Sequence, residues 1–201
     1  MIRLPWFKTK RPLGKALEPR KKNLSPTMTL EQKFNFIYEN RLWGRDPERL
    51  SGPGSYGDCA ETYLAFVRTF LSDYSIRSVT DIGCGDFNIG SQLCDLVDRY
   101  YALDVSSTIV RRNRKRYGGF RNVTFAVADA CAGELPPAEL VTVRQVLQHL
   151  TNDQISKVLN NIERSGFKYA LITEHIVSPA AMARPNLDLP HDSDMGQSPD
   201  R

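Results

Sequence analysis

The stretch Val79-Thr-Asp-Ile-Gly-Cys-Gly-Asp-Phe-Asn-Ile-Gly90 decides the fold of this chain. Residues 78–82 have the apolar character of a short buried strand. The glycines that follow predict a sharp turn, because a residue without a Cβ lets the backbone bend and approach a ligand closely. We expect this turn to lead into a helix over residues 89–97.

Outward from this stretch, strand-like and helix-like segments alternate. Further strands are expected at residues 100–105, 123–128, 140–144 and 169–173. Helices are expected at residues 106–117, capped by Ser106 or Ser107, and from the capping box Thr151-Asn-Asp-Gln154 to about Arg164. The alternation predicts an α/β fold with a Rossmann-like, doubly wound, mainly parallel sheet of about five strands and helices on both faces.

Two more helices are expected before the sheet. The first begins at the capping box Thr29-Leu-Glu-Gln32, and its apolar face continues to Leu42. A loop follows at Ser51-Gly-Pro-Gly-Ser55, and a second helix spans residues 58–72 with its large apolar side chains, Phe66 among them, mostly inward. We divide the chain into a basic arm (1–28), a helical N-terminal cap (29–77), a core with the sheet (78–178) and an irregular tail (179–201).

Charge is distributed unevenly along the 201 residues. The net charge is +4, but residues 1–22 alone carry +7 and the remaining 179 residues sum to −3. The body is therefore not a basic platform for nucleic acid, whereas the arm is able to contact RNA, anionic lipid or an acidic partner. No run approaches the ~20 apolar residues that span a bilayer, so no membrane partner is expected.

The cysteines show neither CxxC spacing nor, together with the histidines, a zinc-binding pattern. They are Cys59, Cys84, Cys94 and Cys131. We expect free thiols, no bound metal and, because free thiols persist in a reducing compartment, a cytoplasmic location.

Three acidic residues follow strands of the expected sheet. Asp104 ends the second strand, 19 residues after Gly85, where a carboxylate is able to accept both hydroxyls of a ribose. Asp129 follows the third strand, within reach of an adenine edge. A dinucleotide cofactor is disfavoured, because its GxGxxG pattern would have a third glycine where Asn88 stands, and because the carboxylate of Asp81 would lie beside a pyrophosphate. Asp81 suits a cofactor with an amino group and a sulfonium.

These motifs resemble the class I S-adenosylmethionine-dependent methyltransferases. The resemblance extends over roughly residues 29–190 and is densest between residues 78 and 175. Within that superfamily the chain is similar to a small bacterial group of methyltransferase-domain proteins. The matching segments are Trp43-Gly44, Ser51-Gly-Pro-Gly-Ser55, Cys84-Gly85-Asp86 and Arg144-Gln-Val-Leu-Gln-His-Leu150.

The resemblance implies roles for ten residues, with S-adenosylmethionine as the cofactor. Three would line its methionine end, namely Asp81, Gly83 and Gly85, and Cys84 would also bind the cofactor. Asp104 would hold the ribose, with Val105 against the adenine, and Asp129 and Ala130 would flank the adenine ring. Arg144 and Gln145 would face the cofactor and the substrate, and the Ser51–Ser55 loop would form part of a lid.

The chain also departs from the family. Many members have a glycine where Phe87 stands, so the turn is expected to close differently. The family's sheet has seven strands, of which the last two form a hairpin beside the fifth, whereas only five strands are indicated here. We therefore expect a fragment or a truncated protein with its fifth strand as an exposed edge, which puts activity in question.

Methyl transfer depends more on aligning the acceptor with the cofactor and excluding water than on acid–base groups. The sequence therefore gives little information about which molecule accepts the methyl group. We expect a small-molecule acceptor, with His175 as the candidate general base and His149 either packed in the core or at the substrate. Three alternatives remain open: a non-catalytic S-adenosylmethionine-binding protein, an RNA methyltransferase that uses the basic arm, and a nicotinamide-dependent oxidoreductase.

Overall fold

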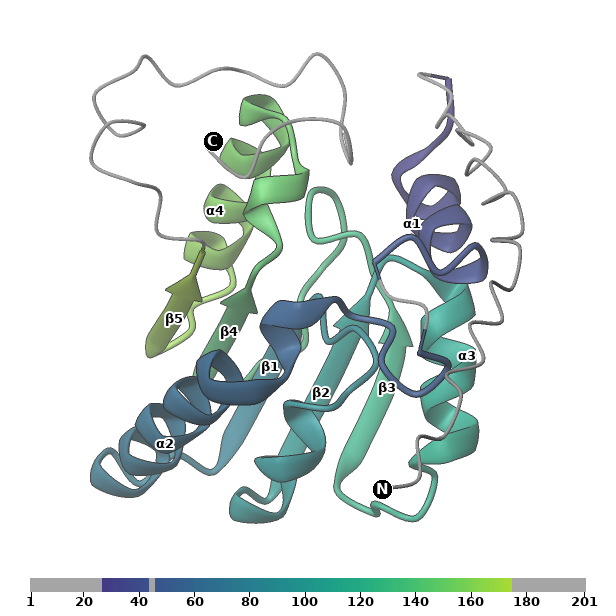
Figure 1. The fold of residues 1–201 in the computed structure, drawn as a ribbon. Helices are drawn as coiled ribbons and strands as arrows, with labels where there is room; N and C mark the ends of the chain where they lie inside the picture. Colours follow the sequence, from purple (N-terminus) through teal and green to yellow (C-terminus); the bar gives the residue numbers. More distant parts are fainter. Residues whose placement is uncertain (1–26, 44–45, 175–201) are drawn as a thin grey trace, which may run out of the picture.

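One parallel sheet organises the molecule (Figure 1). The structure, a computed structural model, describes residues 27–43 and 46–174. Its strands are β1 (Ser78–Ile82), β2 (Arg99–Asp104), β3 (Val123–Val127), β4 (Leu140–Arg144) and β5 (Tyr169–Thr173). They pair in the order β3-β2-β1-β4-β5, with every pairing parallel. The predicted Rossmann-like fold class is therefore confirmed, and the strand order reverses between β1 and β4, where such sheets bind ligands.

Helices cover both faces of this sheet. The α-helices are α1 (Leu30–Glu39), α2 (Gly57–Asp73), α3 (Ser107–Arg116) and α4 (Asn152–Arg164). Short 3₁₀ turns are η1 (Pro53–Ser55), η2 (Gly90–Gln92), η3 (Cys94–Leu96) and η4 (Leu147–His149). Leu64 of α2 and Ile109 of α3 belong to one core cluster with Val79 of β1, whereas Val158 of α4 packs with Ile82 in a second cluster on the opposite face. Successive β1 residues point to opposite faces, so one strand serves both clusters.

The helix starts follow from side-chain caps. Thr29 and Thr151 both form complete capping boxes, and the Ser106 hydroxyl accepts a hydrogen bond from the Ile109 amide. Each cap satisfies amide groups that have no partner inside the helix. All three starts agree with the sequence-based prediction.

Three local predictions are wrong. Residues 89–97 form the turns η2 and η3 instead of one helix. Helix α1 ends at Glu39, and Arg41 takes a left-handed backbone conformation, so Leu42 does not extend the apolar face. Phe66 points outward on α2 and is 55% exposed.

Several predictions fall on residues outside the described ranges. They concern most of the basic arm, Gly44, His175, the irregular tail and the expected absence of a final hairpin. Within the described ranges, no helix has both the length and the apolar character needed to cross a membrane.

Candidate functional site

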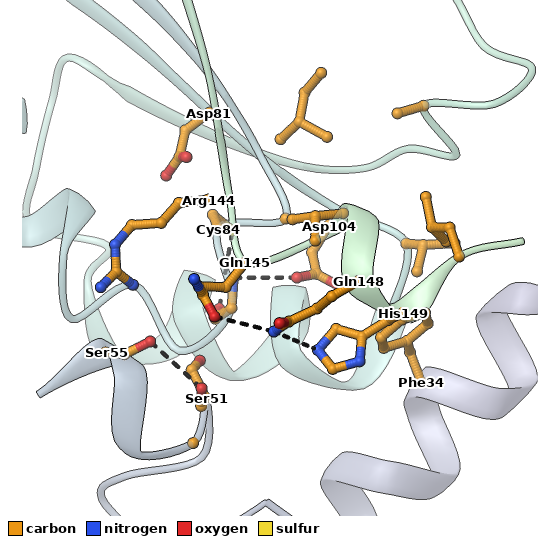
Figure 2. A pocket seen from close by; sticks show the side chains of 18 of the residues that line it. Phe34, Ser51, Ser55, Asp81, Cys84, Asp104, Arg144, Gln145, Gln148 and His149 are labelled. Atoms are coloured by element: carbon orange, nitrogen blue, oxygen red, sulfur yellow. Dashed lines mark hydrogen bonds between the residues drawn. The ribbon is translucent and has the colours of Figure 1, made fainter. Parts of the chain in front are cut away.

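A cavity of about 360 Å³ lies at the carboxyl ends of the strands, where the strand order reverses (Figure 2). All ten residues predicted to bind the cofactor line it, namely Asp81, Gly83, Cys84, Gly85, Asp104, Val105, Asp129, Ala130, Arg144 and Gln145. The candidate base His175 lies outside the described residues. The structure therefore brings together residues that are up to 64 positions apart in the sequence.

The glycine turn after β1 forms the floor of the cavity. Gly83 and Gly85 both have a positive φ, of 73° and 55°. The amides of Gly83 and Cys84 donate to the Leu103 carbonyl at 2.8 and 2.9 Å, which ties the turn to β2. A Cβ on Gly85 would lie 2.2 Å from the Ser51 hydroxyl oxygen, so a side chain there would require Ser51 to move.

Asp104 is held by two backbone amides. Its carboxylate accepts hydrogen bonds from the amide of Gly85 at 3.0 Å and from the amide of Ser106 at 2.9 Å. Burial raises the pKa of Asp104 to about 6, although these two hydrogen bonds act in the opposite direction. The carboxylate is therefore fixed in orientation and keeps further lone pairs for a ligand.

Asp81 and Arg144 supply opposite charges at one end of the cavity. Asp81 accepts hydrogen bonds from the hydroxyls of Thr142 at 2.8 Å and Tyr100 at 3.0 Å. Burial raises the pKa of Asp81, and the nearby Arg144 lowers it. The Arg144 guanidinium lies 4.9 Å from the centre of the Tyr63 ring. Among the described residues, no carboxylate lies within 4.0 Å of it, so this pocket cation has capacity for an anion.

On the other side of the cavity, Asp129 follows β3. One oxygen of its carboxylate accepts a hydrogen bond from the Cys131 amide at 2.8 Å. The Asn161 side chain of α4 donates to the Ala130 carbonyl at 2.9 Å and to the Gly133 carbonyl at 2.7 Å. This loop is therefore fastened to α4, with Asp129 held in place at the cavity.

The sequence leaves the role of Asp86 undecided between a helix cap and a function. The structure shows a buried carboxylate that joins the glycine turn to residues 50–56. It accepts hydrogen bonds from the amides of Leu50 at 2.8 Å and Ser51 at 3.1 Å, and from the Tyr56 hydroxyl. The Asn88 side chain adds a hydrogen bond to the Ser55 carbonyl at 2.7 Å. Residues 50–56 are thereby held against the cavity.

Of two further features of the site, only Glu174 has no clear signal in the sequence. Glu174, directly after β5, accepts hydrogen bonds from the amides of Val146 and Leu147 and so supports η4. His149 stacks on Trp43 with ring centres 4.9 Å apart, and burial lowers its pKa to about 4. His149 is thus both packed and part of the cavity wall, two roles that the sequence presents as alternatives.

Residues 79–165 match a family model described as "Methyltransferase domain". The matched segment, less than half of the chain, is therefore similar to methyltransferase domains. The comparison with curated proteins found no match. The match agrees with the resemblance inferred from the glycine turn and the aspartates after β2 and β3.

Solved structures with the same fold include several methyltransferases. The methyltransferase domain of bacterial CtHen1 has a TM-score of 0.55 at 17% identity, over 68% of this chain and 75% of that one. The N-methyltransferase NodS from Bradyrhizobium japonicum, in complex with S-adenosyl-L-homocysteine, has a TM-score of 0.55 at 21% identity, over 66% and 67%. The DszA carbon methyltransferase has a TM-score of 0.55 at 16% identity, over 73% and 42%. At these identities, the similarity establishes the fold alone.

Proposed function

We propose that the cavity binds S-adenosylmethionine in an extended conformation and that its methyl group passes to a small-molecule acceptor. The order of three carboxylates carries this proposal. Asp81, Asp104 and Asp129 belong to or follow the neighbouring strands β1, β2 and β3, and all line one cavity. Neighbouring strands lie ~4.8 Å apart, so the three carboxylates cover about 10 Å, a path suited to an amino acid, a ribose and a base in a row.

The methionine end of the cofactor fits the charge pair at β1 and β4. An α-amino acid carries an ammonium and a carboxylate, and these groups need partners of opposite charge in a buried site. Asp81 is fixed by two hydroxyls and would hold the ammonium. Arg144, which has no close carboxylate among the described residues, would hold the carboxylate.

The adenosine end fits the residues after β2 and β3. The oriented carboxylate of Asp104 would accept the ribose hydroxyls, and Val105 would contact the adenine. Asp129 would accept a hydrogen bond from the exocyclic amino group, beside Ala130. These residues all line the cavity. Hydrogen bonds from backbone amides orient the carboxylates of Asp104 and Asp129 before a ligand binds.

The structure adds an argument against a dinucleotide. A pyrophosphate is usually bound at the N-terminus of the helix that follows the glycine turn. Here the turn leads into the short 3₁₀ turns η2 and η3. Without an α-helix at that point, the positive end of a helix dipole is missing where the phosphates would lie, which favours the sulfonium cofactor.

When bound, S-adenosylmethionine supplies a methyl group made electrophilic by its positively charged sulfur. The chain's own residues have to align the acceptor and exclude water. Ser51 and Ser55 lie at the cavity wall, and their segment is fastened by Asp86 and by the hydrogen bond from Arg144 to the Gly54 carbonyl. Burial raises the pKa of Cys84, so its thiol stays protonated and does not compete as a nucleophile.

The remaining assignments rest on the sequence. We propose His175 as a general base for acceptors that must lose a proton, and a division into a helical cap (29–77) and a core (78–178). A cytoplasmic location in a bacterium is also proposed, since all four cysteines are free in the structure and the segment Arg144–Leu150 resembles a bacterial group.

Calorimetric titration with S-adenosylmethionine tests the proposal, with NADH as the competing ligand. We expect binding of S-adenosylmethionine alone, weakened at least tenfold (about 1.4 kcal/mol) in Asp104→Ala. The matched control is Asp73→Ala, which removes an exposed carboxylate at the end of α2 and should leave the affinity unchanged. A folded protein that binds NADH, or binds neither ligand, would refute the proposal.

A further inference from the structure

Gln145 has a left-handed backbone conformation at the point where the strand order of the sheet reverses. It directly follows β4, at the reversal of strand order, and lines the cavity. Its φ is 57°, a left-handed conformation that is unfavourable for a residue with a side chain. The hydrogen bond from its amide to the Thr173 carbonyl, at 2.8 Å, holds this conformation. Such conformations cluster at functional sites, where the surrounding structure maintains them.

The side chain of Gln145 is held through its oxygen. The Gln148 amide nitrogen donates to the Gln145 Oε1 at 3.0 Å and lies 3.4 Å from the His149 Nε2 (Figure 2). Figure 2 shows the amide nitrogen of Gln145 turned away from Gln148. No residue in the described part of the chain accepts a hydrogen bond from that nitrogen, so both its N–H groups are available to a ligand.

His149 sets the direction of this short chain of hydrogen bonds. Its ring is packed against Trp43 and Phe34, at centre-to-centre distances of 4.9 and 6.2 Å. Burial lowers the pKa of His149 and keeps the ring neutral at physiological pH, so its Nε2 is able to accept from Gln148. In the tautomer that carries its proton on Nδ1, His149 accepts from Gln148, so Gln148 donates to both neighbours and Gln145 presents donors to the cavity.

Gln145 also lies beside the segment that closes the cavity. A Cβ placed on Gly54 would be 3.9 Å from the Gln145 Oε1, so the two residues are neighbours. Asp104 and Asp129, the proposed ribose and adenine contacts, lie at the end of β2 and just after β3. These two strands are on one side of β1, and β4 is on the other. Gln145 therefore lies on the side of the cavity that the ribose and adenine do not occupy.

We propose that Gln145 selects the methyl acceptor by donating hydrogen bonds to a carbonyl-type oxygen on it, as in an amide, a ketone or a carboxylate. The inference rests on the proposed function, because it assumes that the cofactor extends from Arg144 and Asp81 to Asp129 and leaves the Gln145 side chain free. Gln148 and His149 act as positioning residues that keep the Gln145 amide in one orientation.

The test uses the full chain saturated with S-adenosylhomocysteine and two small probes of similar shape. Benzamide offers a carbonyl oxygen, and benzylamine offers a cationic donor; the affinity of each is measured by ligand-detected NMR titration. We expect benzamide to bind at least tenfold more tightly than benzylamine. Equal affinity, preference for benzylamine or no binding of benzamide would overturn the inference.

Two variants change the direction of the hydrogen bonds without changing side-chain length. Gln145→Glu replaces the two donors with acceptors. In Gln148→Glu, the new carboxylate must accept from the Gln145 amide nitrogen, which turns the Gln145 oxygen toward the cavity. Both should reverse the preference to benzylamine, a result that loss of structure would not produce, whereas Gln92→Glu, on an exposed side chain, should preserve it. Retained preference for benzamide in both variants would contradict the inference.

Binding of S-adenosylhomocysteine to each variant is measured first. Unchanged affinity for it, with a reversed probe preference, supports the assignment of Gln145 to the acceptor. Loss of affinity for S-adenosylhomocysteine in Gln145→Glu would place the residue at the cofactor and overturn the inference. Failure of the unmodified chain to bind S-adenosylhomocysteine would instead refute the proposed function itself.

Discussion

At the level of single residues, Asp104 couples cofactor binding to pH. Burial raises its pKa to about 6, so the free protein loses this proton as the pH rises through about 6. A hydroxyl donates more strongly to a carboxylate than to the neutral acid, so ribose binding favours the charged form and lowers the pKa in the complex. The affinity for S-adenosylmethionine should therefore be constant above about pH 7 and fall as the pH drops through 6.

Titration calorimetry at a series of pH values checks this prediction. Asp104→Asn has no proton to lose, so its weaker binding should show a smaller pH dependence between about pH 7 and pH 5. We assign the pH dependence of the affinity that remains in this variant to Asp81, because burial also raises the pKa of Asp81. An affinity that rises on acidification, or an unchanged slope in Asp104→Asn, would contradict the assigned role of Asp104.

Phe87 shows how one residue redirects the chain. Its φ is 64°, the conformation that a glycine at this position would take without strain. The ring is fully buried, with its centre 4.8 Å from that of Phe125 and 5.6 Å from that of Tyr100. A Cβ on Gly90 would lie 2.2 Å from the same ring. The sequence indicates a differently closed turn, but the aromatic core that holds this turn involves residues distant in sequence.

Among the secondary-structure elements, residues 89–97 show where pattern reasoning fails. The apolar spacing fits a helix, but the Asn88 carbonyl accepts hydrogen bonds from the Ser91 hydroxyl and the Gln92 side chain, at 3.0 and 3.1 Å. Polar side chains that bond to nearby backbone groups compete with helix formation. The strands and capped helices are predictable because their signals are local, whereas the apolar spacing of residues 89–97 gives no sign of these competing hydrogen bonds.

The position of the whole segment of residues 50–56 depends on its hydrogen bonds to Asp86. Asp86→Ala would leave the amides of Leu50 and Ser51 without their acceptor, and the Tyr56 hydroxyl would keep only its 3.4 Å contact with the Glu48 carbonyl. An unpaired buried polar group costs about 1–3 kcal/mol, but these three residues are only half-buried, so we expect the free energy of unfolding to fall by about 1–3 kcal/mol in total. Hydrogen exchange in residues 50–56 should accelerate, and chemical denaturation measures the stability.

An asparagine at position 86 retains one acceptor oxygen and should recover part of the loss, while Asp73→Ala, at an exposed position, should change stability by about 0.5 kcal/mol or less. If Asp86→Ala left both stability and exchange in residues 50–56 unchanged, Asp86 would not be the anchor of this segment.

For the whole molecule, the topology of the sheet explains which part of the site is predictable from the sequence. Side chains at the carboxyl ends of parallel strands meet at one edge, so the strand pattern alone groups Asp81, Asp104 and Asp129. The contribution of the N-terminal part is not predictable in this way. Asn35 of α1 accepts a hydrogen bond from the Ser106 hydroxyl at 2.7 Å, across 71 positions, and no local pattern in the sequence encodes such a contact.

The path of the cofactor through this assembled cavity is the central claim, and a crystal structure of the complex with S-adenosylhomocysteine tests it most directly. We predict that the Asp104 carboxylate lies within hydrogen-bond distance, about 2.7–3.0 Å, of the ribose hydroxyls. The amino acid end should lie between Asp81 and Arg144, with the adenine beside Asp129. A ligand bound in the reverse direction, or a ribose that does not contact Asp104, would contradict the account.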